Sequence, residues 1–201
     1  MNTLQFIKTA MEDYRVGALT ITSPATVSQI VDNLGNNVKY VIEYGAGDGI
    51  VTGEILQRIP SDGKVVAVEL NKNFLPDLES INDSRLTVLY DDVVSVSAKL
   101  SQLGLPRIDA VVSGIPFSFF NSDNRERIVA STYRALCPGG HFIVYQYSTF
   151  LKSLLEKYFT KVQVRYAFKN IPPYFIMVAK KSDNTKMNYD NHISTDYYLT
   201  P

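Results

Sequence analysis

From about Lys39 onward, the sequence alternates between short apolar runs rich in β-branched residues and segments with helical spacing. Short runs that are apolar throughout are typical of strands buried on both faces of a sheet. The strand-like segments are residues 39–44, 64–70, 85–90, 108–114 and 140–148, and the helix-like segments are residues 50–59, 71–81, 122–137 and 149–158. This order predicts an α/β fold, in which helices cover both faces of a mostly parallel sheet.

The chain continues with two strand-like segments, 161–168 and 174–181, whose separation is too short for a crossover helix. We therefore expect them to pair antiparallel, so that the sheet has seven strands and closes with a C-terminal hairpin. Asn71 is a candidate helix cap, and the Pro-Gly-Gly run that begins at Pro138 is expected to stop the helix before it. Sheets of this kind bind ligands at the carboxyl ends of their strands.

The length of 201 residues suits one domain with small appendages. Residues 1–36 are predicted to form a helical segment that acts as a lid or as a membrane contact, with a second helix opened by Ser23. Residues 37–181 are expected to form the main domain. Residues 182–201 are polar and lack hydrophobic periodicity, so we expect a mobile tail.

Cysteine and histidine content excludes several classes of site. The single cysteine, Cys137, permits no intramolecular disulfide and no Cys-based zinc cluster, and it fits a reducing cytoplasm. The two histidines, His141 and His192, lie far apart and have no metal-ligand spacing, so we expect no metal. No secretion signal and no apolar stretch long enough to span a bilayer is visible, and we expect a cytoplasmic protein.

The formal net charge is zero, but the two halves of the chain differ in charge. Residues 1–100 carry 8 Lys+Arg and 13 Asp+Glu, whereas residues 101–201 carry 12 and 7. The basic half is suited to contact with phosphates of lipid or nucleic acid. Solvated faces of a helix and two strands explain the same bias equally well.

The stretch "VIEYGAGDGI" (41–50) combines a strand, a carboxylate and three alternating glycines. A glycine-rich turn before a helix allows a ligand to approach the main chain closely. The spacing differs from that of dinucleotide sites, because Ile50 stands where their third glycine belongs. Glu43 would repel a pyrophosphate and attract a ligand that carries an ammonium and a sulfonium. Close packing within the chain would explain the glycines without any ligand.

Acids also follow the next two strands. Glu69 ends the second strand, where a carboxylate can accept hydrogen bonds from ribose hydroxyls, although a capping or surface role would also explain it. Asp91 and Asp92 follow the third strand, where either can instead be a helix N-cap. The fourth strand ends in the Pro-containing segment 113–117.

The pattern E-x-G-x-G-x-G resembles the first motif of class I S-adenosylmethionine-dependent methyltransferases. This resemblance implies a Rossmann-like fold, S-adenosylmethionine as cofactor and S-adenosylhomocysteine as product. It also implies a set of cofactor-binding residues at successive strand ends. These are Glu43, Tyr44, Gly45, Ala46, Gly47, Gly49, Glu69, Leu70, Asp91, Asp92, Val93 and Ser113.

The flanking segments 14–24, 109–120, 136–148 and 170–181 make the resemblance narrower, since they look like those of bacterial phospholipid N-methyltransferases. The implied reaction is methylation of the amine of phosphatidylethanolamine or its methylated derivatives. The chain is more distantly similar to ribosomal RNA adenine dimethyltransferases. Ser113 replaces the asparagine of their fourth motif, which makes a nucleic acid substrate less favoured. A small-molecule methyltransferase and a non-catalytic cofactor-binding module stay open as further hypotheses.

Candidate substrate residues follow from the same resemblance, and no residue is assigned as a catalytic base. The loop after the fourth strand would lie beside the reactive methyl group, and aromatic faces would stabilise a methylated ammonium. Phe117, Phe119 and Phe120 are interpreted as a substrate lip, although a position in the core would equally fit such a cluster. The candidates are Gly114, Ile115, Pro116, Phe117, Tyr145, Tyr147 and Tyr174.

A phospholipid substrate implies peripheral contact with the inner face of the cytoplasmic membrane. The family is expected to dock through its N-terminal helix, but here Lys8 stands against Glu12 and Asp13, which makes a poor electrostatic anchor. Three interpretations stay open: the apolar face of that helix provides the contact, the basic C-terminal stretch contributes, or the substrate is not a lipid.

Overall fold

The computed structural model describes residues 22–169 and 173–183. The predicted first helix and nearly all of the predicted polar tail lie outside these residues. The described chain contains a seven-stranded sheet with the strand order β3-β2-β1-β4-β5-β7-β6. The strands are β1 Tyr40–Tyr44, β2 Lys64–Glu69, β3 Leu86–Tyr90, β4 Ile108–Ser113, β5 Leu136–Gln146, β6 Lys161–Ala167 and β7 Tyr174–Lys180.

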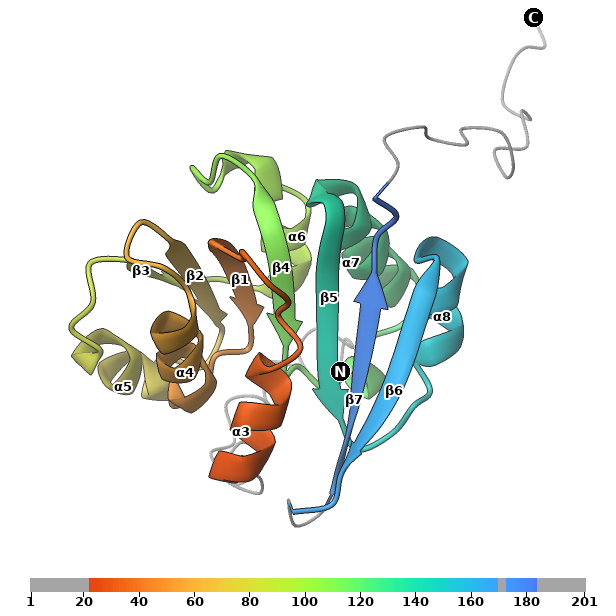
Figure 1. Ribbon diagram of the computed structural model, residues 1–201, viewed down its shortest axis with the longest axis horizontal. Coiled ribbons are helices and arrows are strands. Elements are labelled where there is room, and N and C mark those ends of the chain that lie inside the picture. The colour runs from red at the N-terminus through yellow and green to blue at the C-terminus, as the bar shows by residue number, and fades with distance from the viewer. Residues whose placement is uncertain (1–21, 170–172, 184–201) are drawn as a thin grey trace, which may run out of the picture.

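Strand directions confirm the predicted fold class. β3, β2, β1, β4 and β5 run parallel to one another, whereas β7 pairs antiparallel with β5 and with β6. The chain order reverses its direction of growth between β1 and β4, which is where open α/β sheets bind their ligands. The C-terminal hairpin β6–β7 forms the edge of the sheet opposite β3 (Figure 1).

Helices pack on both faces of the sheet, as predicted (Figure 1). α3 and α4 bury Ile30 and Ile55 against one face, while α6, α7 and α8 bury Val96, Ile128 and Leu155 against the other. The helices are α3 Pro24–Val31, α4 Ile50–Arg58, α5 Leu75–Ser80, α6 Val93–Ser97, α7 Ser122–Ala135 and α8 Lys152–Tyr158, with the 3-10 turns η1 Lys72–Phe74, η2 Leu100–Gln102 and η3 Phe117–Phe119. Within the described residues, no helix is long and apolar enough to cross a membrane.

Two element boundaries differ from those predicted. The segment 71–81 divides into η1, capped by the side chain of Asn71, and the short helix α5 with Pro76 in its first turn. β5 begins at Leu136 rather than at residue 140 and so includes the Pro-Gly-Gly run. Gly139 adopts a φ of 78° and donates its N–H to Ser182 O, so that pairing with the segment just after β7 keeps this run in the sheet.

The parallel strands place their carboxyl ends at one edge of the sheet, the lower edge in Figure 1. The glycine turn after β1, the loop after β4 and the end of β5 all lie there. β6 and β7 are antiparallel to each other, and the end of β6 and the start of β7 lie at this same edge. The fold therefore brings nearly all of the candidate site residues to a single edge.

Candidate active site

The turn after β1 has the backbone that its glycines predict. Gly45, Gly47 and Gly49 have φ values of 74°, 56° and 81°, a left-handed conformation that side chains disfavour. A Cβ atom on Gly45 would lie 2.8 Å from the Ile115 side chain, and one on Gly49 would lie 2.8 Å from Ile81. Close packing therefore requires these two glycines, in addition to their backbone conformation.

Gly47 is different, because a Cβ atom there would have no neighbour within 4 Å among the residues that the structure describes. Packing within the chain does not explain this glycine. The open space beside its backbone is where a ligand can approach the main chain. Gly49 then serves as the N-cap residue of α4, so the turn leads directly into a helix N-terminus.

Glu43, near the end of β1, is completely buried. Its Oε2 accepts a hydrogen bond of 2.6 Å from the Thr52 hydroxyl on α4, whereas its Oε1 is buried without a partner in the described part of the chain. Burial, with a smaller contribution from the carboxylates of Glu69 and Asp48, raises the pKa of Glu43 to about 8. A cationic ligand would stabilise the charged form of this carboxylate and lower its pKa. Thr52 was missed by the sequence analysis, although its place on the inward face of the following helix was a signal.

Ser113, the last residue of β4, carries the second buried polar atom that has no partner among the described residues. Ser113 pairs with Tyr44 in the register of β1 and β4, whereas Glu43 pairs with Val112. Because successive side chains of a strand alternate between faces, Glu43 and Ser113 point to opposite faces of the sheet. These two buried oxygens thus lie on opposite faces of the sheet, near the ends of two adjacent strands.

Tyr44 contributes to the site through its backbone. Its carbonyl oxygen accepts a 3.0 Å hydrogen bond from Gly114 N–H, which joins the glycine turn to the loop after β4. The side chain of Tyr44 lies in the core, where its hydroxyl is 3.1 Å from that of Thr132. Ala46 and Val93 are likewise buried, so none of these three residues exposes a polar side-chain group. We call the strand-end site that contains the glycine turn, Glu43 and Glu69 the cradle.

Glu69 ties the end of β2 to the glycine turn. Its Oε2 accepts a 2.8 Å hydrogen bond from Gly47 N–H, and its Oε1 accepts from the N–H groups of Leu70 and Asn71 at 2.9 and 2.7 Å. Burial raises the pKa of Glu69, and the three backbone donors oppose that effect. Each carboxylate oxygen has two lone pairs, so Oε2 keeps the capacity to accept from a ligand hydroxyl.

Asp91 and Asp92 both have partners within the fold. Asp92 is the N-cap of α6 and accepts from Val94 N–H at 3.0 Å, so the capping role considered for it is confirmed. Asp91 accepts from Asp92 N–H and forms a 3.0 Å ion pair with Lys99, which lowers the pKa of Asp91. A ligand that contacts Asp91 or Asp92 would therefore meet a carboxylate that already has a partner within the fold.

Three of the predicted substrate residues form one aromatic cluster, Tyr145, Tyr147 and Tyr174. The rings of Tyr147 and Tyr174 stack with centroids 4.6 Å apart, and Tyr145 meets Tyr174 edge to face at 5.8 Å. The hydroxyl of Tyr145 lies against Gly114, where a Cβ atom would come within 2.4 Å of it. The loop after β4 therefore connects this cluster with the glycine turn.

Phe117 and Phe120 do not form the predicted substrate lip, and Phe119 is half-buried against the same hydrophobic core. Phe117 and Phe120 are 0% and 4% exposed and pack with Phe142 in the hydrophobic core. The 3-10 turn that follows Pro116 directs their rings inward beneath the sheet edge. Ile115 is buried against Gly45 and has a packing role.

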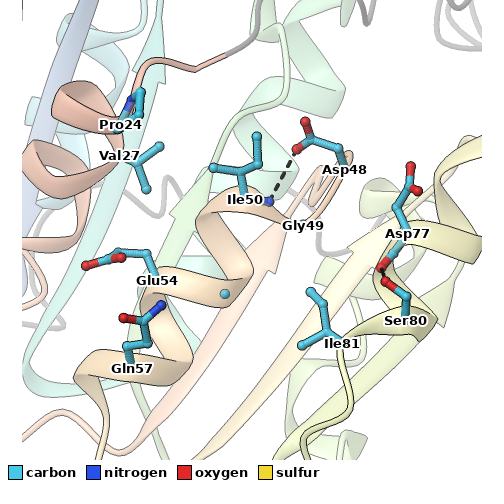
Figure 2. A pocket seen from close by; sticks show the side chains of 11 residues that line it. Pro24, Val27, Asp48, Gly49, Ile50, Glu54, Gln57, Asp77, Ser80 and Ile81 are labelled. Carbon is cyan, nitrogen blue, oxygen red and sulfur yellow. Dashed lines mark hydrogen bonds between the residues drawn. The ribbon is translucent and has the colours of Figure 1, made fainter.

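An open groove of about 600 Å³ lies beside the glycine turn, between α3, α4 and α5 (Figure 2). Asp48, Glu54 and Asp77 line it with carboxylates, and Asp48 accepts from Ile50 N–H at 3.3 Å. Glu43, Glu69 and Ser113 are not among its lining residues, so this groove is distinct from the cradle at the strand ends.

Comparisons with known proteins agree with this geometry. Residues 41–140 match a family described as a methyltransferase domain. The ornithine lipid N-methyltransferase of Singulisphaera acidiphila is 28% identical over 174 residues, which cover 83% of this chain and 91% of that protein. A probable ribosomal RNA small subunit methyltransferase A of Methanospirillum hungatei is 32% identical over 103 residues, 49% of this chain and 36% of that protein.

Among solved structures, the N-methyltransferase NodS of Bradyrhizobium japonicum in complex with S-adenosyl-L-homocysteine aligns with a TM-score of 0.66. The alignment covers 90% of this chain and 99% of that chain at 12% identity. The shared fold, the room left at Gly47 and the free oxygen of Glu43 all suit a cationic sulfur nucleoside. The chain belongs to the class I methyltransferases and is an enzyme that uses S-adenosylmethionine.

Proposed function

We propose that this enzyme transfers methyl groups to the amine of a membrane lipid, with the headgroup of phosphatidylethanolamine or its methylated derivatives as the acceptor. The observation that carries this proposal is the tyrosine cluster, Tyr145, Tyr147 and Tyr174, beside Gly114 at the strand ends. The similarity to an ornithine lipid N-methyltransferase, which spans most of both chains, supports an amine on a lipid.

The tyrosine cluster suits an amine that gains positive charge with each methyl group. Aromatic faces stabilise such a cation by about 0.5 to 2 kcal/mol. Burial raises the pKa of Tyr145 well above its ordinary value, so its hydroxyl stays neutral and can accept a hydrogen bond from an ammonium or an amine. Tyr147 is 43% exposed, which leaves the cluster open to an acceptor arriving from solvent or from a surface.

The residues of the cradle have complementary tasks in this proposal. Gly47, Glu43 and Glu69 would hold the cofactor, which supplies an electrophilic methyl group on a sulfonium. The Tyr145 hydroxyl, which lies against Gly114, would orient the amine so that its lone pair points at the methyl carbon. The nitrogen–carbon bond forms as the carbon–sulfur bond breaks, and a proton on the resulting ammonium passes to water. This step requires no protein base.

The enzyme would work at the cytoplasmic face of a membrane, where its acceptor is found. An adenine in RNA is the second candidate acceptor, favoured by the match to a probable ribosomal RNA methyltransferase. This chain spans 36% of that protein, and Ser113 lacks the amide that would hold an adenine amino group. We therefore treat RNA as the outcome that would replace the lipid proposal.

The test is transfer of a radiolabelled methyl group from S-adenosylmethionine to mixed micelles of phosphatidylethanolamine, with structured RNA and free ethanolamine as parallel acceptors. We expect label in the lipid alone. Tyr145→Phe should lower kcat about tenfold and leave the affinity for S-adenosylhomocysteine unchanged, because the ring remains while the hydroxyl is lost. Label in RNA and none in lipid would overturn the proposal.

A further inference from the structure

The end of the β6–β7 hairpin exposes large apolar side chains. Tyr166 and Phe168 are 49% and 70% exposed, and Val164 on the same face of β6 is 37% exposed. The ring of Tyr166 packs against that of Phe175 with centroids 5.2 Å apart, so the two strands share this aromatic surface. We name Tyr166, Phe168 and Phe175, with the cations Arg165 and Lys169, the hairpin patch.

The charge around the hairpin patch has one sign. The sequence from Phe159 to Ser182 contains no Asp or Glu, whereas Arg165 and Lys169 directly adjoin Tyr166 and Phe168 in the sequence. Both cations are exposed, and neither forms an ion pair with any residue that the structure describes. Their charge is thus available to an anionic partner.

The hairpin patch lies at the same edge of the sheet as the tyrosine cluster. β7 begins at Tyr174, whose ring stacks on Tyr147, and Phe175 of the patch is the next residue. Figure 1 shows that the hairpin extends beyond the end of β5 at this edge. Phe150, which follows β5 and lies under Arg125 at 5.4 Å, is a further exposed aromatic residue there.

We infer that the hairpin patch is the surface by which the enzyme docks on an anionic membrane. This inference rests on the proposed function, since it names the surface from which a lipid amine would reach the tyrosine cluster. Aromatic side chains prefer the headgroup region of a bilayer, and cations beside them are attracted by anionic lipids. Docking here places the tyrosine cluster against the headgroups, so a headgroup can enter while its acyl chains stay in the bilayer.

A protein partner or a second copy of this chain is less suited to the patch. An apolar surface flanked by unpaired cations requires a partner with dispersed negative charge and an apolar interior, which a bilayer containing phosphatidylglycerol provides. A second copy would place Arg165 and Lys169 near their own equivalents, since a two-fold contact brings like charges together.

The test is flotation of the full-length protein with vesicles of phosphatidylethanolamine and phosphatidylglycerol, compared with vesicles of phosphatidylcholine. Phe168→Ser removes a mostly exposed ring, so the variant should fold, and we expect vesicle binding to fall about tenfold. In the double variant R165Q/K169Q, vesicle binding should fall about fivefold for each cation removed. The difference from the wild type should shrink at high salt. Its matched control is K64Q/K161Q, which removes two exposed cations at the opposite edge of the sheet and should bind like the wild type.

Methyl transfer to a short-chain phosphatidylethanolamine below its micelle concentration separates this inference from the proposed function. We expect F168S and R165Q/K169Q to methylate this dissolved acceptor like the wild type and to fail with vesicles. Absence of methylation in every lipid form would refute the proposed function. Methylation with unchanged flotation of both variants, or with an equal loss in K64Q/K161Q, would overturn the docking surface alone. A change from dimer to monomer in F168S without a change in flotation would also overturn it.

Discussion

Asp109, where the parallel strands begin (the amino edge), and Glu43, where they end (the carboxyl edge), differ in how fully their carboxylates are hydrogen-bonded. At the amino edge, Asp109 is 6% exposed, and its Oδ2 accepts from the N–H groups of Lys39 and Tyr40 at 2.9 and 3.0 Å. Its Oδ1 forms a 2.6 Å ion pair with Arg107 and accepts from the thiol of Cys137. At the carboxyl edge, Glu43 is fully buried, and one of its oxygens has no partner within residues 22–169 and 173–183.

This difference distinguishes a carboxylate that the fold itself uses from one that is a candidate for contact with a ligand. A buried polar atom without a hydrogen bond costs about 1–3 kcal/mol, so a chain selected for stability alone would not keep one. Asp109 joins the starts of β1 and β4, and Lys181 similarly donates to the carbonyls of Tyr133 and Leu136 at the end of α7. Both oxygens of Asp109 thus have partners within the fold, whereas we expect Glu43 Oε1 to contact the cofactor.

The largest expected effect is on stability at the amino edge. Asp109→Ala removes the acceptor of two backbone N–H groups and should lower the free energy of unfolding by about 3 kcal/mol, measured by urea denaturation. The affinity for S-adenosylhomocysteine, measured by calorimetry on the folded variant, should stay within about twofold of the wild type. If the folded variant bound S-adenosylhomocysteine more weakly than this, Asp109 at the amino edge would influence the ligand site at the carboxyl edge.

At the carboxyl edge, Glu43→Gln should weaken ligand binding strongly and change the free energy of unfolding little. The affinity for S-adenosylmethionine should fall about 100-fold, because the neutral amide cannot supply a negative charge to a cationic ligand. The free energy of unfolding of the ligand-free protein at pH 7 should change by less than about 1 kcal/mol, since burial already keeps most of Glu43 protonated there. Retained affinity in this variant would remove Glu43 from the cofactor site.

The glycine turn allows the same contrast within five residues. Gly49→Ala should cost about 2 kcal/mol of stability, because its Cβ would overlap Ile81 in addition to the backbone strain. Gly47→Ala should cost about 1 kcal/mol from strain alone but should weaken cofactor binding about tenfold or more. Thermal denaturation with and without S-adenosylhomocysteine measures both quantities. Equal loss of affinity in both variants would contradict a special role for the space at Gly47.

The smallest effect is a dependence on pH. Glu43 has a pKa of about 8 when folded without ligand, against 4.5 ordinarily, so the folded state binds more protons and its stability falls as the pH rises from about 4.5 to about 8. Binding of S-adenosylmethionine should reverse this preference and release a proton near pH 7, which calorimetry in buffers of different ionisation enthalpy detects.

The control for proton release is Glu43→Gln, because the α-amino group of the cofactor can also titrate. The difference between the wild type and this variant isolates the contribution of Glu43. Below pH 8, this contribution should raise the affinity for S-adenosylmethionine by nearly tenfold for each unit by which the pH increases. Identical proton release in the two proteins would show that the Glu43 carboxyl does not ionise on binding.

The order of elements was predictable from the sequence because it depends on local periodicity. Apolar runs, helical spacing and turn residues are encoded within a few positions, so the seven strands, the antiparallel hairpin and the tight glycine turn were all confirmed. The start of β5 at Leu136 was not predictable, because the pairing that holds Gly139 involves Ser182, far along the chain.

What a given side chain does at the strand ends was decided by the tertiary structure. The sequence placed Phe117 beside the reactive methyl group, but the fold buries it against Phe142. It offered Gly45, Gly47 and Gly49 as equivalent, but only packing against Ile115 and Ile81 shows that Gly47 faces open space. The sequence by itself determined the fold and the kind of cofactor, since both follow from residue types at fixed spacing. Which oxygen of Glu43 lacks a partner depends on atoms from distant elements, which only the folded chain brings together.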